Sequence, residues 1–283
     1  MNIFISGSNG FIGKNLKIFF KEKGFSVYSI NREYFNLNVH DFANIIYNAD
    51  VIINLSGFPI YKPWTKKNFK KILASRINTN IKFYEALKII NNKNIIYFTA
   101  SAIGIYDNIH IHNEDSSLYS NDELSDIICK WEDAAKKIQT CVNNFYIFRL
   151  GIVIAKNNGF LENILKFSGL YIFPFSINNP CLSIIHIDDV VQIFYYIISK
   201  KPESYIYNVV CTKWISIRDF LKLIKNYKPF LIIPLPQFFF KFIFGRRHIL
   251  FTKGQKVISK NLNTFNYHYK FSLPVDIIKE VFK

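Results

Sequence analysis

Cysteine is scarce in this chain, and its few residues are poorly placed for metal binding or for a disulfide scaffold. The four cysteines are far apart and form no C-x-x-C pair; they are Cys129, Cys141, Cys181 and Cys211. This spacing excludes the usual cysteine zinc motifs and argues against a small disulfide-stabilised fold. We therefore expect no metal site, and a reducing environment as the compartment in which the protein works.

Long uninterrupted apolar runs are also lacking. The chain leads from Met1 straight into a short apolar stretch, without the basic segment and apolar core of a secretory signal. The most membrane-like segment, 230–244, contains Pro234, Pro236 and Lys241 and is too short to span about 30 Å of hydrocarbon. We expect a soluble cytoplasmic protein without a transmembrane segment.

A phenylalanine-rich stretch, 238–244, stands out within that segment and is followed by Arg246 and Arg247. Two interpretations are open. The stretch packs against the sheet domain of the protein, which we favour, or it lies on a membrane surface as a basic amphipathic segment.

Acidic residues are few, with 20 Asp and Glu against 36 Lys and Arg, which gives a formal net charge of +16. The lysines are spread along the chain, and the abundance of Ile, Asn, Lys, Phe and Tyr is typical of an AT-rich genome. We interpret the charge as a compositional bias and expect no nucleic-acid partner. Attachment to nucleic acid or to an anionic membrane is the alternative.

The hydrophobic pattern predicts the fold class. Hydrophobic residues make up 50% of the chain and charged residues 20%, which excludes wholesale disorder. The expected strands are 3–6, 25–30, 50–55, 94–99 and 145–154, and the expected helices are 11–23, 68–90 and 125–138. Strands that are apolar on both faces suit a parallel sheet covered by helices. The alternation predicts an α/β fold with a doubly wound (Rossmann) parallel sheet.

A glycine-rich turn follows the first expected strand and opens the first expected helix. Its residues 7–13 read GSNGFIG, in G-x-x-G-x-x-G spacing. The first glycine permits a tight turn, the second lets the backbone approach a pyrophosphate, and the third allows close helix–strand packing. The helix N-terminus offers free N–H groups to phosphate. The turn predicts dinucleotide binding by Gly7, Asn9, Gly10, Phe11, Ile12 and Gly13.

The end of the second expected strand indicates which dinucleotide is bound. An acidic residue that would hold the ribose 2′-hydroxyl of NAD is absent from the strand end, where Asn31 and Arg32 stand instead. A guanidinium suits a 2′-phosphate through charge-assisted bidentate hydrogen bonds. We favour NADP as the cofactor. In the alternative, the cofactor is NAD, Arg32 is a solvated loop residue, and Glu33 holds the ribose.

Several segments, together with the glycine turn, resemble the extended short-chain dehydrogenase/reductases, the NAD-dependent epimerase/dehydratase superfamily. They are 38–41 (NVHD), 50–57 (DVIINLSG) and 99–106 (TASAIGIY). More narrowly, the chain resembles epimerase-like family 39 of that superfamily. The segments that carry this likeness are 54–60, 64–65, 75–76, 131–132, 149–154 and 185–190, and a tail, 245–282, similar to that family's C-terminal domain of unknown function.

The resemblance implies further cofactor contacts. Asn38 would lie near the adenine ring. Leu55, Ser56 and Gly57 would line the cofactor cleft. Thr99 and Ala100 would lie near the nicotinamide ribose, next to Ser101.

The chain is expected to divide into two parts. The NAD(P)-binding Rossmann domain covers 1–160, and 183–212 returns to it. A smaller C-terminal substrate lobe consists of 161–182 and 213–283, in which 245–283 forms a small C-terminal domain.

The catalytic pair of the superfamily is missing. Hydride-transferring members use Tyr-x-x-x-Lys, in which the lysine lowers the tyrosine pKa. With Glu132 aligned to the glutamate that usually follows, Leu124 stands at the tyrosine position and Ile128 at the lysine position. The remaining catalytic candidates are Ser101, which would hydrogen-bond cofactor or substrate, and Tyr106, which either transfers a proton or forms a wall of the pocket.

Two functions therefore stay open. The first is an NAD(P)-binding, epimerase-like oxidoreductase that transfers a hydride to or from an unknown carbonyl or hydroxyl substrate, with a homodimer left open as its assembly. The second is a non-catalytic NADP(H)-binding module that senses redox state, and the missing Tyr/Lys pair supports it.

Three polar motifs have less specific interpretations. We expect His110 and His112 to lie in a surface loop, and Asp188 or Asp189 to cap the helix that begins near Val190. Arg76 either faces a substrate anion or pairs with a neighbour across its own helix.

Overall fold

A parallel six-stranded sheet forms the centre of the molecule. The structure is a computed structural model that describes residues 1–156, 161, 172–203 and 205–283. The strands are β1 (Asn2–Ser6), β2 (Ser26–Ile30), β3 (Val51–Asn54), β4 (Ile96–Ala102), β6 (Asn144–Leu150) and β11 (Ile206–Val209). Their order is β2-β1-β3-β4-β6-β11, so the direction of winding reverses between β1 and β3. The predicted α/β, doubly wound class is confirmed, and a ligand crevice is expected at that reversal.

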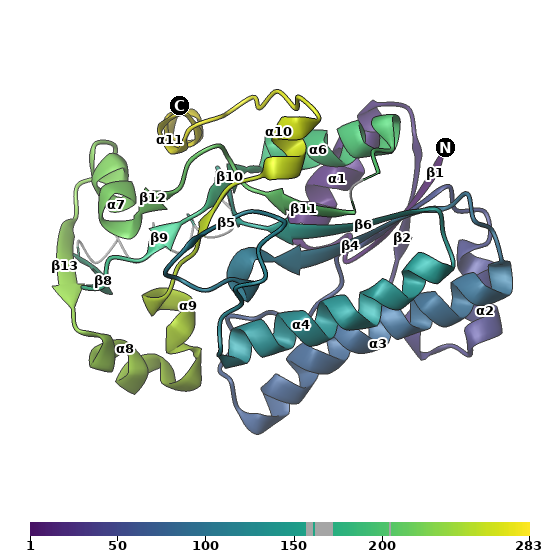
Figure 1. Ribbon diagram of the computed structural model, residues 1–283, viewed down its shortest axis with the longest axis horizontal. Coiled ribbons are helices and arrows are strands. Elements are labelled where there is room, and N and C mark those ends of the chain that lie inside the picture. The colour runs from purple at the N-terminus through teal and green to yellow at the C-terminus, as the bar shows by residue number, and fades with distance from the viewer. Residues whose placement is uncertain (157–160, 162–171, 204) are drawn as a thin grey trace.

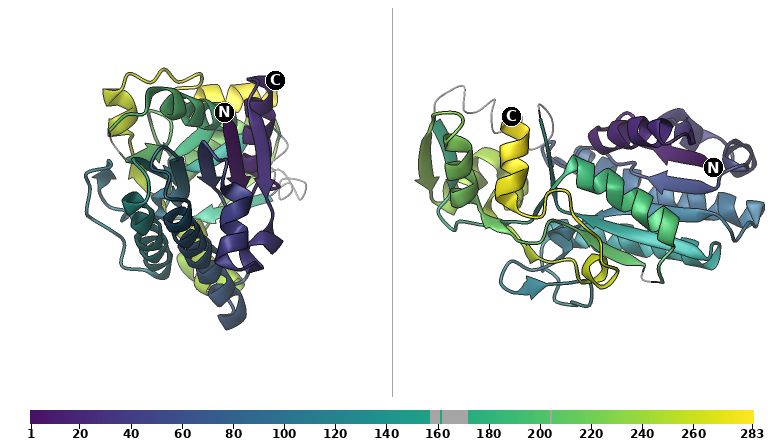
Figure 2. Two further views of the ribbon diagram at one scale, coloured as in Figure 1. Left: turned by 90° about the vertical axis from the view of Figure 1, so that its right-hand side faces the viewer. Right: turned by 90° about the horizontal axis from the view of Figure 1, so that it is seen from above.

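Helices cover both faces of the sheet (Figures 1 and 2). One layer contains α1 (Phe11–Glu22) and α6 (Ile187–Lys200), and the other contains α2 (Val39–Ile46), α3 (Lys66–Ile90) and α4 (Glu123–Lys136). Alternate residues of β1 serve the two layers: Ile3 and Ile5 pack in the core under α1 and α6, and Phe4 packs in the core over α2 and α3. This explains why the strands read as continuous apolar runs.

The remaining elements form a smaller lobe and several short connections. The paired strands are β7 (Ile152–Ala155) with β10 (Ile184–His186), β8 (Ile172–Ser176) with β13 (Leu231–Leu235), β9 (Cys181–Leu182) with β12 (Ile215–Ser216), and β5 (Ile111–His112) with β14 (Lys256–Val257). The helices are α7 (Ile217–Lys225), α8 (Gln237–Phe244), α9 (Ile249–Thr252), α10 (Lys260–Thr264) and α11 (Pro274–Phe282). The short 3₁₀ helices are η1 (Arg32–Asn36), η2 (Ile103–Ile105), η3 (Lys137–Thr140) and η4 (Gly245–His248).

The smaller lobe has its own apolar core, which contains Phe220, Leu221 and Ile277. The chain leaves the sheet after β6 and returns to it through α6 and β11. The expected boundary near residue 160 lies outside the described residues. Among the helices that the structure describes, none is long and apolar enough to cross a membrane.

Two carboxylates, of half-buried Glu114 and buried Asp189, attach the C-terminal segment to the sheet domain. Glu114 accepts hydrogen bonds from the backbone N–H groups of Asn208 at 2.9 Å and Lys260 at 2.8 Å. Asp189 accepts from the N–H groups of Lys270 at 2.7 Å and Phe271 at 3.0 Å. Each carboxylate thus satisfies backbone donors from a distant part of the chain.

The expected aspartate cap of α6 is therefore wrong. His186 is the N-cap, and its Nδ1 accepts a hydrogen bond from the Asp188 N–H at 3.2 Å. The Asp189 carboxylate instead accepts hydrogen bonds from the Lys270 and Phe271 N–H groups of the C-terminal segment.

The surface-loop prediction holds for His110, which is exposed, and is wrong for His112. His112 ends strand β5, is fully buried, and stacks on the Tyr106 ring at a centroid distance of 4.8 Å. Its Nε2 lies 3.1 Å from the Asp107 carboxylate. His112 is buried because β5 pairs with β14. The two strands lie 145 residues apart along the chain, so a local sequence pattern does not predict their pairing.

Candidate cofactor-binding site

The glycine turn between β1 and α1 is too crowded for side chains at two of its three glycines. Gly7 has φ +74°, and a Cβ there would lie 2.7 Å from the Leu55 carbonyl oxygen. A Cβ at Gly13 would lie 2.3 Å from the Gly7 carbonyl oxygen. At Gly10 the nearest atom would be 3.1 Å away, so this position is the least crowded of the three. Gly7 and Gly13 are thus required by packing, whereas a Cβ at Gly10 would make one close contact only.

The N-terminus of α1 is free to bind an anion. Gly10 is its N-cap, and among the described residues no side chain caps the helix and no acidic residue stands in its first turn. The Phe11 and Ile12 N–H groups have no intrahelical acceptor. The exposed N–H groups and the positive end of the helix dipole together favour a phosphate here.

A cavity of about 740 Å³ lies beside this turn. Its walls come from the glycine turn, the end of β2 with η1, the loop after β3, and one side of α3. They are Gly7, Ser8, Asn9, Ile30, Asn31, Arg32, Glu33, Phe35, Asn36, Ser56, Gly57, Ala74, Ser75, Asn78, Thr79, Ile81, Lys82 and Glu85. The cavity sits where the order of the strands reverses, as expected for a doubly wound sheet.

The cavity brings together six of the residues chosen from the sequence: Gly7, Asn9, Asn31, Arg32, Ser56 and Gly57. The contribution of α3 was missed. Its residues Ser75, Asn78 and Lys82 lie within a long helix whose sequence pattern indicates only packing. Small and polar side chains recurring every three or four residues along one side of that helix were the available signal.

Positive charge reaches the cavity from both sides. Arg32 is exposed at its rim and makes no ion pair within the described part of the chain. Lys82 lies across from it on α3 and donates a hydrogen bond to the Leu37 carbonyl oxygen. Glu33 also lines the cavity, so both of the groups proposed for the ribose end are present.

Several other predicted cofactor residues lie outside the cavity lining. Asn38 is the N-cap of α2, where its side chain accepts from the Asp41 N–H at 2.9 Å. Leu55 packs its side chain against the core, and Thr99 and Ala100 are buried at the end of β4. In this structure these residues support the cleft and do not line the cavity.

A buried network of polar side chains fixes the floor of the cleft. Asn54, at the end of β3, accepts a hydrogen bond from the Ser6 hydroxyl at 2.7 Å and donates to the Asn80 side-chain oxygen at 3.1 Å. The Tyr97 hydroxyl donates to the same Asn80 oxygen at 3.0 Å. Three strands and α3 are held in register below the cavity in this way.

A second buried network lies at the ends of β4 and β6. Arg149 and Glu132 form a two-point ion pair, with Nε to Oε1 at 2.8 Å and Nη2 to Oε2 at 2.7 Å. Ser101 donates to Glu132 Oε1 at 2.5 Å. Both charged side chains are almost completely buried. Such a pair is stable because each charge is neutralised and hydrogen-bonded by the other.

Tyr106 belongs to this second network. Its hydroxyl accepts a hydrogen bond from Arg149 Nη1 at 2.7 Å and donates to the Asn208 side-chain oxygen at 3.0 Å. Burial raises the pKa of Tyr106 to about 12, against the lowering effect of Arg149. The phenol is fully buried and both of its hydrogen-bonding roles are occupied.

The positions of the missing catalytic pair are filled by apolar packing. Leu124 and Ile128 lie against Gly104, where an added Cβ would meet them at 2.9 and 3.3 Å. Ile128 is 2% exposed. The space that would hold a phenol and an ammonium group is therefore closed by hydrocarbon.

Arg76 does not pair with an acidic residue in the described chain. Its Nη1 donates to the carbonyl oxygens of Phe58 at 3.0 Å and Ile72 at 3.1 Å, and its guanidinium lies 5.0 Å from the Trp131 ring centroid. Burial lowers the pKa of Arg76 to about 10. The residue ties the loop after β3 to α3, close to Gly57 in the cavity wall.

The described residues contain no group of three His, Cys, Asp or Glu side chains that could hold a metal ion. The parallel doubly wound sheet, the glycine turn at its reversal point and the cavity beside it together define a Rossmann fold of the nucleotide-binding type.

Comparison with known proteins narrows this class. No family model matches the chain. The chain is 27% identical over 291 residues to the epimerase family protein YfhF of Bacillus subtilis, covering 96% of this chain and 95% of that protein. It is 22% identical over 305 residues to the chloroplastic epimerase family protein SDR39U1 homolog of Arabidopsis thaliana, covering 99% and 86%.

Solved structures show the same fold. The human epimerase family protein SDR39U1 (isoform 2), crystallised with NADPH, superposes with a TM-score of 0.85 at 22% identity, covering 99% of both chains. A dTDP-4-dehydrorhamnose reductase from Clostridium acetobutylicum superposes with a TM-score of 0.80 at 14% identity, covering 99% and 98%. The resemblance to the epimerase/dehydratase superfamily, and to its family 39, is confirmed.

Proposed function

We propose that this protein binds NADP(H) in the cleft beside the glycine turn and transfers a hydride to or from a carbonyl or hydroxyl carbon of a small-molecule substrate. One observation carries the proposal: the glycine turn, through Gly7 to Asn9, and Arg32 border the same cavity of about 740 Å³, and the turn leads directly into the uncapped N-terminus of α1. The human SDR39U1 structure, which contains NADPH, supports it.

The residues present fit this dinucleotide. A pyrophosphate beside the glycine turn would accept hydrogen bonds from the Phe11 and Ile12 N–H groups at the uncapped start of α1. Arg32, with Lys82 in the same lining, would hold a 2′-phosphate through charge-assisted hydrogen bonds, against the opposing charge of Glu33 and Glu85, which also line the cavity. When bound, NADP(H) supplies the hydride donor or acceptor.

Ser101 is the stronger of the two catalytic candidates. Ser101 is 2% exposed and lies outside the cavity lining; its hydroxyl proton is donated to Glu132, which leaves oxygen lone pairs to accept a hydrogen bond from the hydroxyl of a substrate that reaches the end of β4. Tyr106 is held by Arg149 and Asn208 and has a pKa of about 12, so it serves better as a positioning residue for Arg149 than as a proton donor near neutral pH.

The matched pair Gly10→Asp and Gly10→Ala tests cofactor binding. A methyl group at this position meets only one atom, at 3.1 Å, so Gly10→Ala should bind NADPH within about tenfold of the parent protein. Gly10→Asp places a carboxylate against the pyrophosphate, and the binding signal in a calorimetric titration should disappear. Equal binding by parent and Gly10→Asp would refute the assigned site.

A second function is a non-catalytic NADP(H)-binding module that senses redox state. The observation that favours it is the packing of Leu124 and Ile128 against Gly104, where the catalytic pair would stand. Oxidation of bound NADPH, followed at 340 nm across a panel of carbonyl and sugar-nucleotide substrates, separates the two. Turnover supports the oxidoreductase; tight binding without turnover on the whole panel supports the module.

We further propose that the protein works in the cytoplasm. Its four cysteines are free thiols, which suits a reducing compartment. Fractionation of cells that express a tagged chain would test this location.

A further inference from the structure

Helix α8 exposes an unusual amount of apolar surface. Phe242 is 90% exposed, Phe238 63% and Ile243 61%, and Phe239 is exposed beside them. These side chains are spaced i, i+1, i+4 and i+5, so they lie along one side of the helix. Exposed hydrophobic residues are ordinary when they are scattered, but a contiguous group of this size indicates an interaction surface.

The opposite side of α8 holds the helix to the protein. Phe240 is buried, and its ring lies 6.1 Å from that of Phe244, which stacks on Phe251 at 4.3 Å. The inner side of the 238–244 stretch thus contacts Phe251 of α9, whereas the sequence predicted packing against the sheet domain. The exposed phenylalanines therefore belong to a helix that is packed on the rest of the protein through its other side.

The first turns of α3 continue the same surface. The guanidinium of Arg246, just after α8, lies 4.8 Å from the Phe69 ring of α3, and Arg247 donates to the Tyr61 carbonyl oxygen. Ile249 packs in one cluster with Trp64 and Ile72. In Figure 1, α8, α9 and the start of α3 lie along the same lower side of the molecule.

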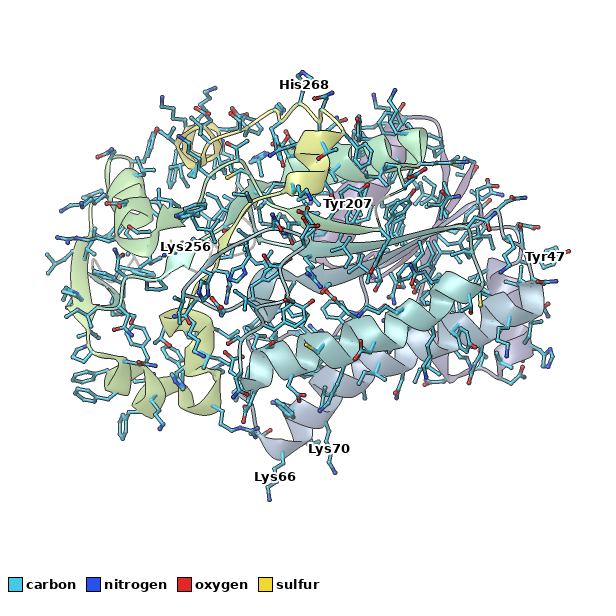
Figure 3. All side chains as sticks on the ribbon, in the orientation of Figure 1. Tyr47, Lys66, Lys70, Tyr207, Lys256 and His268 are labelled. Carbon is cyan, nitrogen blue, oxygen red and sulfur yellow. The ribbon has the colours of Figure 1, made fainter. Side chains whose placement is uncertain are left out.

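This side of the molecule is strongly basic. Five exposed lysines stand on or just before the first turns of α3, and another stands among the phenylalanines of α8; they are Lys62, Lys66, Lys67, Lys70, Lys71 and Lys241. Lys66 and Lys70 project away from the protein in Figure 3. The sequence has no Asp or Glu from 51 to 84 or from 220 to 275. Two neighbouring acidic residues are brought to this region: Glu123 pairs with Arg246, and Asp122 pairs with Lys253.

We propose that this aromatic-basic face, formed by Phe238, Phe239, Phe242 and Ile243 of α8 with these six lysines, binds the surface of an anionic lipid bilayer. The apolar side chains would enter the boundary between headgroups and acyl chains, and the lysines would contact the headgroup phosphates. The face needs no membrane-spanning helix, and none of its residues lines the cofactor cavity, because the residues of α3 in the cavity wall begin at Ala74, beyond the lysines of the face.

Two other occupants fit less well. A second copy of the chain would make a two-fold contact, in which the same lysines of both copies come together without acidic partners. A nucleic acid would match the charge, but Phe242 and Ile243 offer adjoining apolar surface without the hydrogen-bonding groups that read or position a nucleotide. Hydrocarbon next to anionic headgroups matches both parts of the face.

Co-sedimentation of the full chain with vesicles tests the proposal. Binding is expected to phosphatidylcholine vesicles that contain about a quarter phosphatidylglycerol, to weaken steeply between 50 and 300 mM salt, and to be at least tenfold weaker with pure phosphatidylcholine. Vesicles of the two compositions that bind equally well, or not at all, would overturn it.

Two variants test the two parts of the face. F238S/F242S and K66Q/K67Q/K70Q/K71Q should each weaken binding to the anionic vesicles at least tenfold. The matched controls remove similar groups elsewhere: I18S/I109S, at two other exposed apolar positions, and K21Q/K88Q/K200Q/K225Q, at four other exposed lysines. The controls should bind within about threefold of the parent.

Unchanged circular dichroism and NADPH titration would show that each variant is folded, and the vesicle result does not depend on cofactor binding. Equal loss in face variants and controls would mean that only overall charge or hydrophobicity matters, and would refute the face. The proposal would also be overturned if the parent chain formed a dimer that F238S/F242S converts to a monomer, or if the face bound single-stranded DNA and did not bind vesicles.

Discussion

The carboxylate of Glu132 accepts two hydrogen bonds from the guanidinium of Arg149, with donor–acceptor distances of 2.8 and 2.7 Å, and both side chains are almost completely buried. One residue comes from α4 and the other from β6. Ser101 and Tyr106 both hydrogen-bond to this pair, so it fixes the two catalytic candidates relative to the end of the sheet.

Removing one charge of this pair should destabilise the fold strongly. Glu132→Gln leaves the Arg149 charge buried without a counter-ion, and losses of this kind are about 3–5 kcal/mol. Urea unfolding at pH 7 measures the difference. The control Asp126→Asn breaks the exposed Lys130–Asp126 pair on the same helix and should change stability little. Similar losses in both variants would contradict the role assigned to burial.

The three glycines of the turn should respond differently to alanine. Gly13→Ala would place a methyl group 2.3 Å from the Gly7 carbonyl oxygen, so α1 must move away from β1, and we expect a loss of at least about 2 kcal/mol in unfolding free energy. Gly10→Ala has more room and should lose less than about 1 kcal/mol. Thermal or urea unfolding of both variants checks the order. A reversed order would mean that the turn differs from the one described.

His186 should make stability depend on pH below neutrality. Its Nδ1 must be unprotonated to cap α6, and burial lowers its pKa. As the pH falls through about 6.5, the unfolded chain takes up a proton that the folded protein resists, so stability is lost on acidification. His186→Asn keeps a capping acceptor and has no such titration. Between pH 7 and 5 the parent should therefore lose more stability than the variant; parallel curves would refute this.

Tyr106 should contribute to loss of stability at alkaline pH. Its pKa of about 12 lies above the usual value near 10, so the contribution is complete below pH 10 and is lost as the pH rises from 10 to 12. Tyr106→Phe removes this titration and, at pH 7, costs about 1 kcal/mol because a buried hydrogen bond disappears. Urea unfolding from pH 8 to 12 should show a shallower fall for the variant. A Tyr106 that ionises near pH 7 would restore it as a proton donor.

Local patterns predicted the parts of the site that local geometry builds. The turn at Gly7, the position of Arg32 after β2 and the strand end at Ser56 and Gly57 are each encoded within a few residues, and the cavity brings them together. The wall formed by α3 was missed, since Asn78 reaches the cavity only because the Asn54–Asn80 contact seats its helix against β3.

Long-range contacts account for most of the remaining differences. Glu114 and Asp189 bind backbone groups from residues 208 to 271, and a sequence pattern does not show which acidic residue will meet which distant N–H. The same applies to His112, whose burial depends on β14. The outward direction of Phe242 was likewise hidden, because the 238–244 stretch is apolar on both sides of its helix.

The preference between NADPH and NADH, measured by calorimetry on the parent chain and on Arg32→Gln, tests the central claim most directly. We predict that the parent binds NADPH at least tenfold more tightly than NADH, and that Arg32→Gln loses most of this preference while its affinity for NADH changes little. Equal binding of the two dinucleotides by the parent, or a preference that survives in Arg32→Gln, would contradict the account.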